Sequence, residues 1–241
     1  MRWPVAEKST LTDKELHCHV LPLSQEVKTS AWRASLSTSE IATAESYRHM
    51  ESRATYIQSR VVLRELLAGY LGCKATEVEI VIGDKGKPHV AGPIHFNIAH
   101  TSGRALFAFA LRGQVGADVE AIRPSNDWSQ IARRFFCPEE AAELASFPPR
   151  DRDAAFFRCW TRKEAFIKAT GEGLSMPLDS FRVSMTQKSA QFLKLPGEAG
   201  QWKLYDIDAG PGFAAALAHP GAELDLRLFK AEVPEWLRMS R

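Results

Sequence analysis

Hydrophobic and polar residues follow two different periods along this chain, and each period predicts one type of element. In the first half, alternation with a period of two, or a short apolar run between turns, predicts strands at 16–20, 78–82, 94–98 and 105–111. Apolar side chains with helical spacing predict a long helix over 52–70, and the glycine at 72 supplies its end. The segment Ser37-Thr38-Ser39-Glu40 predicts the capped start of a shorter helix before it.

The second half of the chain repeats this order of elements with different residues. A strand over 115–120 precedes a short helix at 128–135, a helical turn beginning at Pro138 and a long helix over 153–169. Further strands are predicted at 181–185, 191–195, 202–207, 213–218 and 224–229. The expected fold class is therefore α+β, with two pseudo-duplicated halves at 1–112 and 113–241. Small-molecule sites often form between domains, so we expect the functional site at the interface of the halves.

The strand predicted at 16–20 carries two histidines. Its apolar residues alternate with His17 and His19, which therefore share one face of the strand. Two imidazoles at this spacing can chelate a metal ion, but no third ligand stands nearby in the sequence. We therefore expect a half-exposed strand face here rather than a metal site.

The strand predicted at 115–120 places two carboxylates close together. Its apolar residues alternate with Asp118 and Glu120, which therefore lie on one face, a few ångströms apart. Two like charges this close repel each other, and a hard divalent cation bound by their oxygens removes the repulsion. The alternative is a solvated strand edge, where charged residues are usually found.

The long helix predicted over 153–169 carries a third carboxylate. Trp160, Glu164 and Lys168 follow one another at four-residue intervals along one stripe. Glu164 can supply another oxygen ligand, while Lys168, one turn further along, can meet a phosphate. The same pair can be a simple surface ion pair, but the aromatic residues of this helix indicate burial, and a buried carboxylate needs a partner. We favour a metal ion as that partner.

Small polar residues end the strand predicted at 94–98. The run 97–103 turns through threonine, serine and glycine, so its amides and hydroxyls can accommodate phosphate oxygens. His100 adds an imidazole that can donate to a phosphate. Taken alone, His100 is better explained as a turn histidine bonded to local backbone.

Four basic residues of the first half also bear on phosphate binding. Lys87 precedes Pro88, which favours an extended conformation for the lysine. Arg53, Arg60 and Arg64 project from the first long helix and can line one side of it, where a solvated basic stripe is the default interpretation.

Composition narrows the class of protein. The 241 residues are 45% hydrophobic and 25% charged, which is typical of soluble globular proteins, and the net charge of +2 does not indicate a nucleic-acid or membrane binder. No apolar run approaches the roughly 18 residues of a membrane span, and the N-terminus lacks the apolar segment of a signal peptide. The four cysteines are scattered without a Cys-x-x-Cys pair, so we expect reduced thiols in a cytoplasmic protein.

Four motifs in one order resemble the 4′-phosphopantetheinyl transferases. They are Gly-Lys-Pro at 86–88, Phe-Asn-Ile-Ala-His-Thr at 96–101, Gly-Ala-Asp-Val-Glu at 116–120 and Trp-Thr-Arg-Lys-Glu-Ala-Phe-Ile-Lys at 160–168. The resemblance extends from about Arg53 to Leu174. It is to the larger, Sfp-like class, in which one chain carries two pseudo-duplicated halves.

Residue by residue, the resemblance implies a Mg²⁺ site beside a site for coenzyme A. The residues that match the family's metal ligands are Asp118, Glu120 and Glu164. Those that match its coenzyme A-binding residues are Arg53, Lys87, His100, Thr101, Lys163 and Lys168. Arg53 is matched to the 3′-phosphate and Lys87 to the adenosine-phosphate pocket. The chain departs from the pattern at Ala54 and Thr55, where close relatives often carry basic residues.

The activity implied by the resemblance is that of a holo-[acyl-carrier-protein] synthase type of enzyme. A serine of an apo acyl or peptidyl carrier protein attacks the β-phosphorus of coenzyme A, phosphopantetheine moves to the serine, and 3′,5′-ADP leaves. Lys168 and His100 are expected to stabilise charge on the diphosphate together with Mg²⁺. Glu164 is the first candidate for the base that activates the serine, and His100 is the second.

Two other functions remain alternatives. A Mg²⁺-dependent nuclease uses similar residues, but the near-neutral charge counts against it. A non-catalytic module that binds coenzyme A or a carrier would hardly need three metal ligands. Because carriers are typically acidic around the modified serine, the run 128–138, which carries arginines and aromatics, is the candidate docking surface. A duplicated chain builds its cleft without a second subunit, so we expect a monomer.

Overall fold

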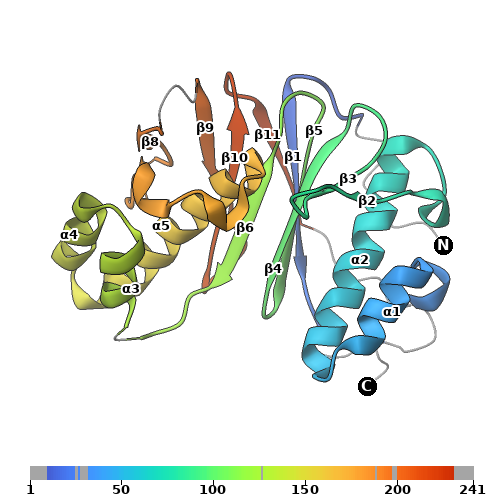
Figure 1. Cartoon of the computed structure of the whole chain (residues 1–241), viewed down its shortest axis with the longest axis horizontal. Helices are drawn as coiled ribbons and strands as arrows, with labels where there is room; N and C mark the ends of the chain where they lie inside the picture. Colours follow the sequence, from blue (N-terminus) through green and yellow to red (C-terminus); the bar gives the residue numbers. More distant parts are fainter. Residues whose placement is uncertain are drawn as a thin grey trace.

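Two β-sheets pack face to face in the middle of the molecule, and a long helix covers the outer face of each (Figure 1). The computed structural model describes residues 10–24, 27, 32–125, 127–187, 189–196 and 200–230. Within these residues the chain combines helices with mainly antiparallel strands, which confirms the predicted α+β class. The duplication of the two halves stays a prediction.

The first sheet has the strand order β11-β1-β5-β4. Its strands are β1 (Glu15–Pro22), β4 (His95–Thr101), β5 (Arg104–Ala110) and β11 (Asp225–Lys230). The last of these comes from the far end of the chain and pairs in parallel with β1, whereas the other pairings are antiparallel. A division of the chain at 112/113 therefore separates the two sheets except for β11.

Helix α2 (Met50–Leu71) packs on the outer face of the first sheet, where its leucines and valines meet the phenylalanines of β4 and β5. The predicted end is confirmed, because Gly72 adopts the left-handed conformation with φ 70°. The preceding helix, α1 (Thr38–Ser46), begins with the predicted capping box: the Glu40 amide donates to the Ser37 hydroxyl, and the Ser37 amide donates to the Glu40 carboxylate.

The second sheet has the order β6-β10-β9 and is antiparallel throughout. Its strands are β6 (Gly116–Ala121), β9 (Trp202–Asp206) and β10 (Phe213–Pro220). Helix α5 (Pro149–Thr170) packs on the outer face of this sheet, and α3 (Trp128–Phe135) and α4 (Pro138–Ser146) pack beside α5. The long helix ends as predicted, at Gly171 in the left-handed conformation.

Between the sheets lies a core that both halves share. Alternate residues of β1 and β5 face alternate residues of β6 and β10 across it, among them Cys18, Leu106, Val119 and Leu217. The layers are therefore helix, sheet, sheet and helix. The edge strands β4 and β6 belong to different sheets and lie side by side.

Several predicted strands are shorter than expected. The segment 78–82 forms only β2 (Val81–Ile82), which pairs with β3 (Pro88–His89). The segments 181–185 and 191–195 likewise form only β7 (Arg182–Val183) and β8 (Phe192–Lys194). Single-turn helices occupy Trp32–Ala34, Ala75–Glu77, Gly173–Ser175 and Leu178–Ser180. An apolar pattern can mark burial without a partner strand, as at Val78, which packs in the core around α2.

The prediction that His17 and His19 lie on a half-exposed face is wrong, because both side chains are buried under α2. His17 Nδ1 and His19 Nε2 lie 2.8 Å and 2.9 Å from the Tyr70 hydroxyl. Phe229 of β11 stacks on the His19 ring at 4.6 Å between centroids. Burial lowers the pKa of His19 to about 3, so the ring is neutral and helps to hold β11 against β1.

A fully buried ion pair connects α4 to α5. Lys163 Nζ lies 2.8 Å from a carboxylate oxygen of Glu140, and both side chains have no exposed area. The same ammonium donates to the carbonyls of Leu178 and Phe181, while the Glu140 carboxylate accepts the Val183 amide. Because both charged groups also make hydrogen bonds to the backbone, the pair fixes the side of α5 that faces α4.

Gly116 brings α5 unusually close to β6. A Cβ atom at this position would lie 1.9 Å from the Ala165 carbonyl oxygen and 2.4 Å from the Ala169 nitrogen. The helix backbone therefore rests directly on the strand backbone, with no side chain between them.

We expect Gly116→Ala to destabilise the protein by about 3 kcal/mol or more, because α5 must move away from β6. The matched control is Gly221→Ala, where φ is 90° but a Cβ would meet no atom within 4 Å. That control carries only backbone strain, worth about 1–2 kcal/mol. Urea denaturation measures both, and equal losses of stability in the two variants would contradict the close contact.

Candidate active site

The outer face of β6 presents two carboxylates to α5, as the alternation predicted. Asp118 is buried, with 5% of its surface exposed, and Glu120 is partly buried. Lys168 of α5 places its ammonium 2.6 Å from Asp118 Oδ1. Ala117 and Val119, on the opposite face of the strand, lie in the core between the sheets.

Glu164 lies one helical turn before Lys168 and completes a cluster of three carboxylates. Burial, and then the charges of Asp118 and Glu120, raise the pKa of Glu164. Burial also raises the pKa of Glu120, and the Asp118 carboxylate adds to this effect. For Asp118 burial raises the pKa, while Lys168 opposes the shift. The three acidic side chains thus lie within electrostatic range of one another.

Negative charge exceeds positive charge within this cluster. Lys168 is the ammonium bonded to it, and it contacts only one oxygen of Asp118. The other oxygen, Asp118 Oδ2, is buried and has no hydrogen-bond partner among the described residues. A buried, unpartnered carboxylate oxygen is costly, so the donor set fits a hard cation. As they stand, no three His, Cys, Asp or Glu side chains in the described part of the chain are grouped closely enough to hold a metal ion.

The end of β4 adds His100 and Thr101 to the carboxylates. Thr101 Oγ1 donates to Glu120 Oε2 at 3.3 Å. His100 is exposed to solvent, and its pKa is lowered by partial desolvation among its neighbours and then by the positive charges of Lys168 and Arg60. The first half therefore contributes one imidazole and one hydroxyl to a site whose carboxylates come from the second half. Arg60, which the sequence placed in a solvated stripe, belongs to its electrostatic surroundings.

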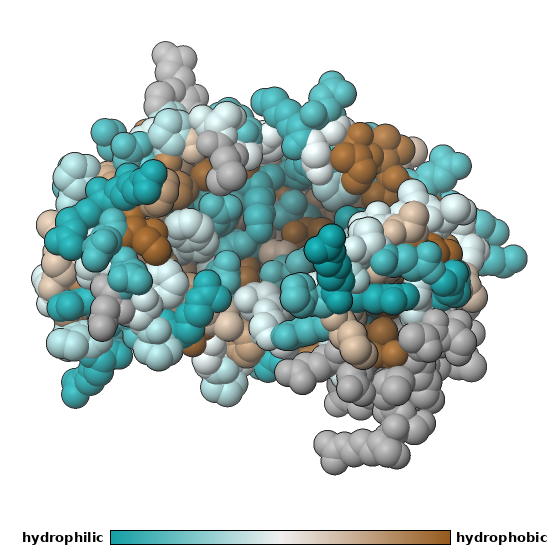
Figure 2. Space-filling view, turned by 60° about the horizontal axis from the view of Figure 1, so that its bottom comes forward, coloured by the Kyte–Doolittle hydropathy of each residue, from teal (hydrophilic) through white to brown (hydrophobic). Residues whose placement is uncertain are grey.

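The face on which β4 and β6 end is hollowed. In Figure 1 both strands point downward at these ends, and Figure 2 turns that side forward. The hollow lies between the two lobes of the molecule, and hydrophilic residues line it (Figure 2). The hydrogen bond from Thr101 of β4 to Glu120 of β6 joins the two halves here, so the carboxylates lie at the interface where the site was expected.

Lys87 is bonded to the backbone of the second half, whereas Arg53 lies over an aromatic ring of the first half. Lys87 Nζ donates to the carbonyls of Val115 and Ala169, at 3.1 Å and 3.2 Å, and burial lowers its pKa to about 8. Its ammonium thus joins the first half to β6 and to the end of α5. The Arg53 guanidinium lies 5.7 Å from the centre of the Trp32 ring and makes no hydrogen bond to the described residues. Neither residue contacts the carboxylate cluster.

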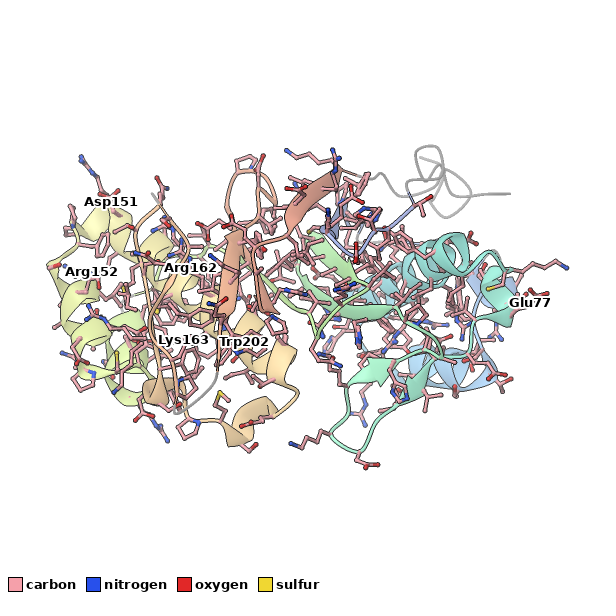
Figure 3. All side chains as sticks on the ribbon, turned by 90° about the horizontal axis from the view of Figure 1, so that it is seen from above. Glu77, Asp151, Arg152, Arg162, Lys163 and Trp202 are labelled. Atoms are coloured by element: carbon pink, nitrogen blue, oxygen red, sulfur yellow. The ribbon has the colours of Figure 1, made fainter. Side chains whose placement is uncertain are left out.

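Lys163 does not belong to the site, and the predicted contact with coenzyme A does not fit its position. Its side chain lies within the core of the second half (Figure 3), where it is bound to Glu140 and two backbone carbonyls. On a helix, successive residues point in directions about 100° apart, so Lys163 faces α4 while Glu164 faces β6. Sequence adjacency to a site residue was therefore misleading.

Asn97 is a residue whose individual role the sequence did not reveal. Its side-chain oxygen accepts the Ala117 amide at 2.9 Å, and the residue is 5% exposed. The available clue was an amide side chain between two apolar residues, Phe96 and Ile98. A buried amide of this kind requires a bonding partner.

Comparison with known proteins agrees with these observations. The sequence profile of the 4′-phosphopantetheinyl transferase superfamily matches residues 114–218. The 4′-phosphopantetheinyl transferase HetI of Nostoc sp. is 33% identical over 90% of this chain and 93% of its own length. The 4′-phosphopantetheinyl transferase Sfp of Bacillus subtilis is 28% identical over 88% of this chain and 94% of its own.

A third relative is the putative 4′-phosphopantetheinyl transferase slr0495 of Synechocystis sp., 32% identical over 72% of both chains. Among the described residues, no helix combines the length and the apolar character that crossing a membrane requires. The match to the family profile and the identities to these relatives show that the chain belongs to the 4′-phosphopantetheinyl transferase superfamily, whose members transfer the phosphopantetheine group of coenzyme A to a carrier protein.

Proposed function

We propose that the chain transfers the 4′-phosphopantetheine group from coenzyme A to a serine of an apo acyl or peptidyl carrier protein, with Mg²⁺ held by Asp118, Glu120 and Glu164. The observation that supports the metal is the unpartnered, buried Oδ2 of Asp118 beside two further carboxylates. When bound, Mg²⁺ supplies positive charge that polarises the diphosphate. No observation favours a nuclease or a non-catalytic binding module.

The residues of the chain have distinct tasks in this proposal. Lys168 exchanges its bond to Asp118 for the diphosphate of coenzyme A, and His100 donates a hydrogen bond to the same group. Glu164 is the first candidate for the general base, because its carboxylate would lie beside the metal-bound diphosphate that the serine attacks. His100 is the second candidate for the base, since its lowered pKa keeps the imidazole neutral.

The transfer balances in one displacement. The serine oxygen of the carrier forms a bond to the β-phosphorus, and the bond from that phosphorus to the bridging oxygen breaks. The serine proton passes to the Glu164 carboxylate, while 3′,5′-ADP leaves with the bonding electron pair. The chain supplies position and charge rather than a covalent intermediate.

The proposed surface for the carrier lies on the last turn of α3. Trp128 and Phe136 of the predicted run pack in the core around Phe156, so they have structural roles. Arg133 and Arg134 are exposed, and Phe135 is 42% exposed beneath the Arg134 guanidinium. Exposed arginine and aromatic groups suit an acidic carrier.

Two further expectations concern the state of the protein. The four cysteines are free thiols, which agrees with the proposed cytoplasmic location. Both halves of the site come from one chain, so a monomer suffices for the proposed activity. A cofactor other than Mg²⁺, a nucleic acid or a membrane has no part in it.

Incubation with coenzyme A, Mg²⁺ and an apo carrier protein should increase the mass of the carrier by one phosphopantetheine group. We expect a chelator to abolish the gain and Glu164→Gln to slow it by about 100-fold or more, because both a ligand and the base are lost. The exposed Glu172→Gln, beyond the end of α5, is the matched control and should retain full activity. Unchanged transfer by Glu164→Gln, or in the presence of the chelator, would contradict the proposed roles, and mass spectrometry measures both.

The stabilisation of the protein by Mg²⁺ should increase with pH. The raised pKa values of Asp118, Glu120 and Glu164 mean that the metal-free folded state holds protons more tightly than the unfolded chain. The resulting stability is complete below the unfolded pKa values of about 4 and is lost as pH rises through the raised values. Mg²⁺ requires the ionised forms, so it compensates for the loss only at the higher pH.

Thermal unfolding with and without Mg²⁺ checks this expectation. The increase in Tm should be smaller at pH 5 than at pH 8, where we expect a few degrees. Asp118→Asn removes one ligand and should abolish the increase at pH 8. An increase of equal size at both pH values would argue against carboxylate ligands.

Docking of the carrier is tested at Phe135. We expect Phe135→Ser to raise the KM for the carrier by about tenfold, because an exposed aromatic anchor is lost, while the KM for coenzyme A stays unchanged. Leu193→Ala on β8, which is 45% exposed outside the proposed surface, is the matched control. Steady-state kinetics with each substrate varied in turn measures the two constants, and equal effects of both variants would place the carrier elsewhere.

A further inference from the structure

The edge of β6 that faces the first half is bonded by side chains rather than by a strand. On its other edge β6 pairs with β10. Towards β4, the amide of Ala117 donates to Asn97 Oδ1 at 2.9 Å, and the amide of Ala121 lies 3.4 Å from Thr101 Oγ1. Two side chains of β4 thus accept the backbone amides of β6 that a neighbouring strand would accept in a continuous sheet.

The spacing of these bonds is the same on the two strands. Asn97 and Thr101 are four residues apart on β4, and their partners Ala117 and Ala121 are four residues apart on β6. Lys87 adds a third bond in the same series, from its ammonium to the Val115 carbonyl. Three side chains of the first half therefore hold the backbone at Val115, directly before β6, and at Ala117 and Ala121 within β6.

The held positions flank the carboxylates of the site. Ala117 immediately precedes Asp118, and Ala121 immediately follows Glu120. A shift of β6 along β4 would move both carboxylates relative to His100, which lies on β4 itself. Displacements of about 1 Å in catalytic groups can reduce a rate by about 100-fold.

Asn97 accepts a shorter hydrogen bond from β6 than Thr101 does, 2.9 Å against 3.4 Å, and its side chain is the more buried of the two. It is 5% exposed, and its neighbours Phe96 and Ala99 are core residues. A polar amide at such a position costs stability unless it is bonded, so an apolar residue would serve packing alone better. What an apolar residue lacks is an acceptor for the Ala117 amide.

We propose that Asn97 is a positioning residue, which fixes β6 against β4 and thereby sets Asp118 and Glu120 relative to His100. It does not contact the substrates. Its effect on the reaction rests on the proposed function, whereas its effect on β6 does not. Thr101 and Lys87 extend the same attachment to the two ends of the strand.

Asn97→Leu tests the proposal, because leucine has nearly the same shape and no acceptor. We expect kcat to fall by about 100-fold with little change in the KM for coenzyme A, and the Mg²⁺ concentration for half-maximal activity to rise. Asn97→Asp keeps an acceptor oxygen at the same place and should recover at least about tenfold of the loss in kcat. A wild-type kcat in Asn97→Leu, or equal losses in the two variants, would overturn the proposal.

Hydrogen exchange gives a readout that needs no activity. The Ala117 amide should exchange at least about tenfold faster in Asn97→Leu, measured relative to the Leu217 amide across the sheet. Ile98→Ala is the matched control, since Ile98 is the next residue and packs on the opposite core, around α2. It should reduce stability while leaving that exchange ratio and the Mg²⁺ dependence unchanged.

The two readouts separate the possible failures. If the wild-type protein modifies no carrier but the Ala117 amide loses protection as expected, the proposed function fails and the attachment of β6 stands. If transfer occurs and the Ala117 amide stays protected in Asn97→Leu, the role of Asn97 is refuted.

Discussion

The direct contact between α5 and β6 at Gly116 is the constraint on which the site depends. Because no side chain separates the two backbones there, the helix lies close enough for Glu164 and Lys168 to reach the carboxylates of the strand. A larger residue would move the helix outward, and the same displacement would separate Glu164 and Lys168 from the two carboxylates of β6. On the side of α5 that faces α4, the buried ion pair of Lys163 and Glu140 resists rotation of the helix. Packing and chemistry are therefore set by the same contact.

The two halves divide the work unequally. The second half carries the three carboxylates and Lys168, which we propose binds the diphosphate, whereas the first half mainly holds β6 in position through Lys87, Asn97 and Thr101. Strand β11 returns from the end of the chain to pair with β1, so the halves are also joined by main-chain bonds. The shared core between the sheets buries apolar residues of both halves. Such an arrangement explains why a site at the interface needs sequence motifs in both halves.

Local sequence signals predicted most of the elements, since caps, glycine stops and periodicity act over a few residues. The capping box at Ser37, the stop at Gly72 and the shared face of Asp118 and Glu120 are confirmed. Burial of His17 could not be read from the sequence, because it depends on Tyr70, which is distant along the chain. Lys163 was misassigned for the same reason: its partner Glu140 lies on another helix. Contacts between distant segments decide what a polar residue does.

The ion pair between Asp118 and Lys168 shows how the cluster is balanced when neither metal nor substrate contributes charge. Three carboxylates close together would repel each other if all were ionised, and two effects reduce that cost: the raised pKa values and the ammonium of Lys168. In the proposed mechanism, Asp118, Glu120 and Glu164 would hold a divalent cation whose charge replaces that of the Lys168 ammonium beside Asp118. Lys168 would then be available to the anionic diphosphate, and because it already lies beside the carboxylates, little reorganisation would be needed. The lysine would thus exchange one anionic partner for another, and that exchange would couple metal binding to substrate binding.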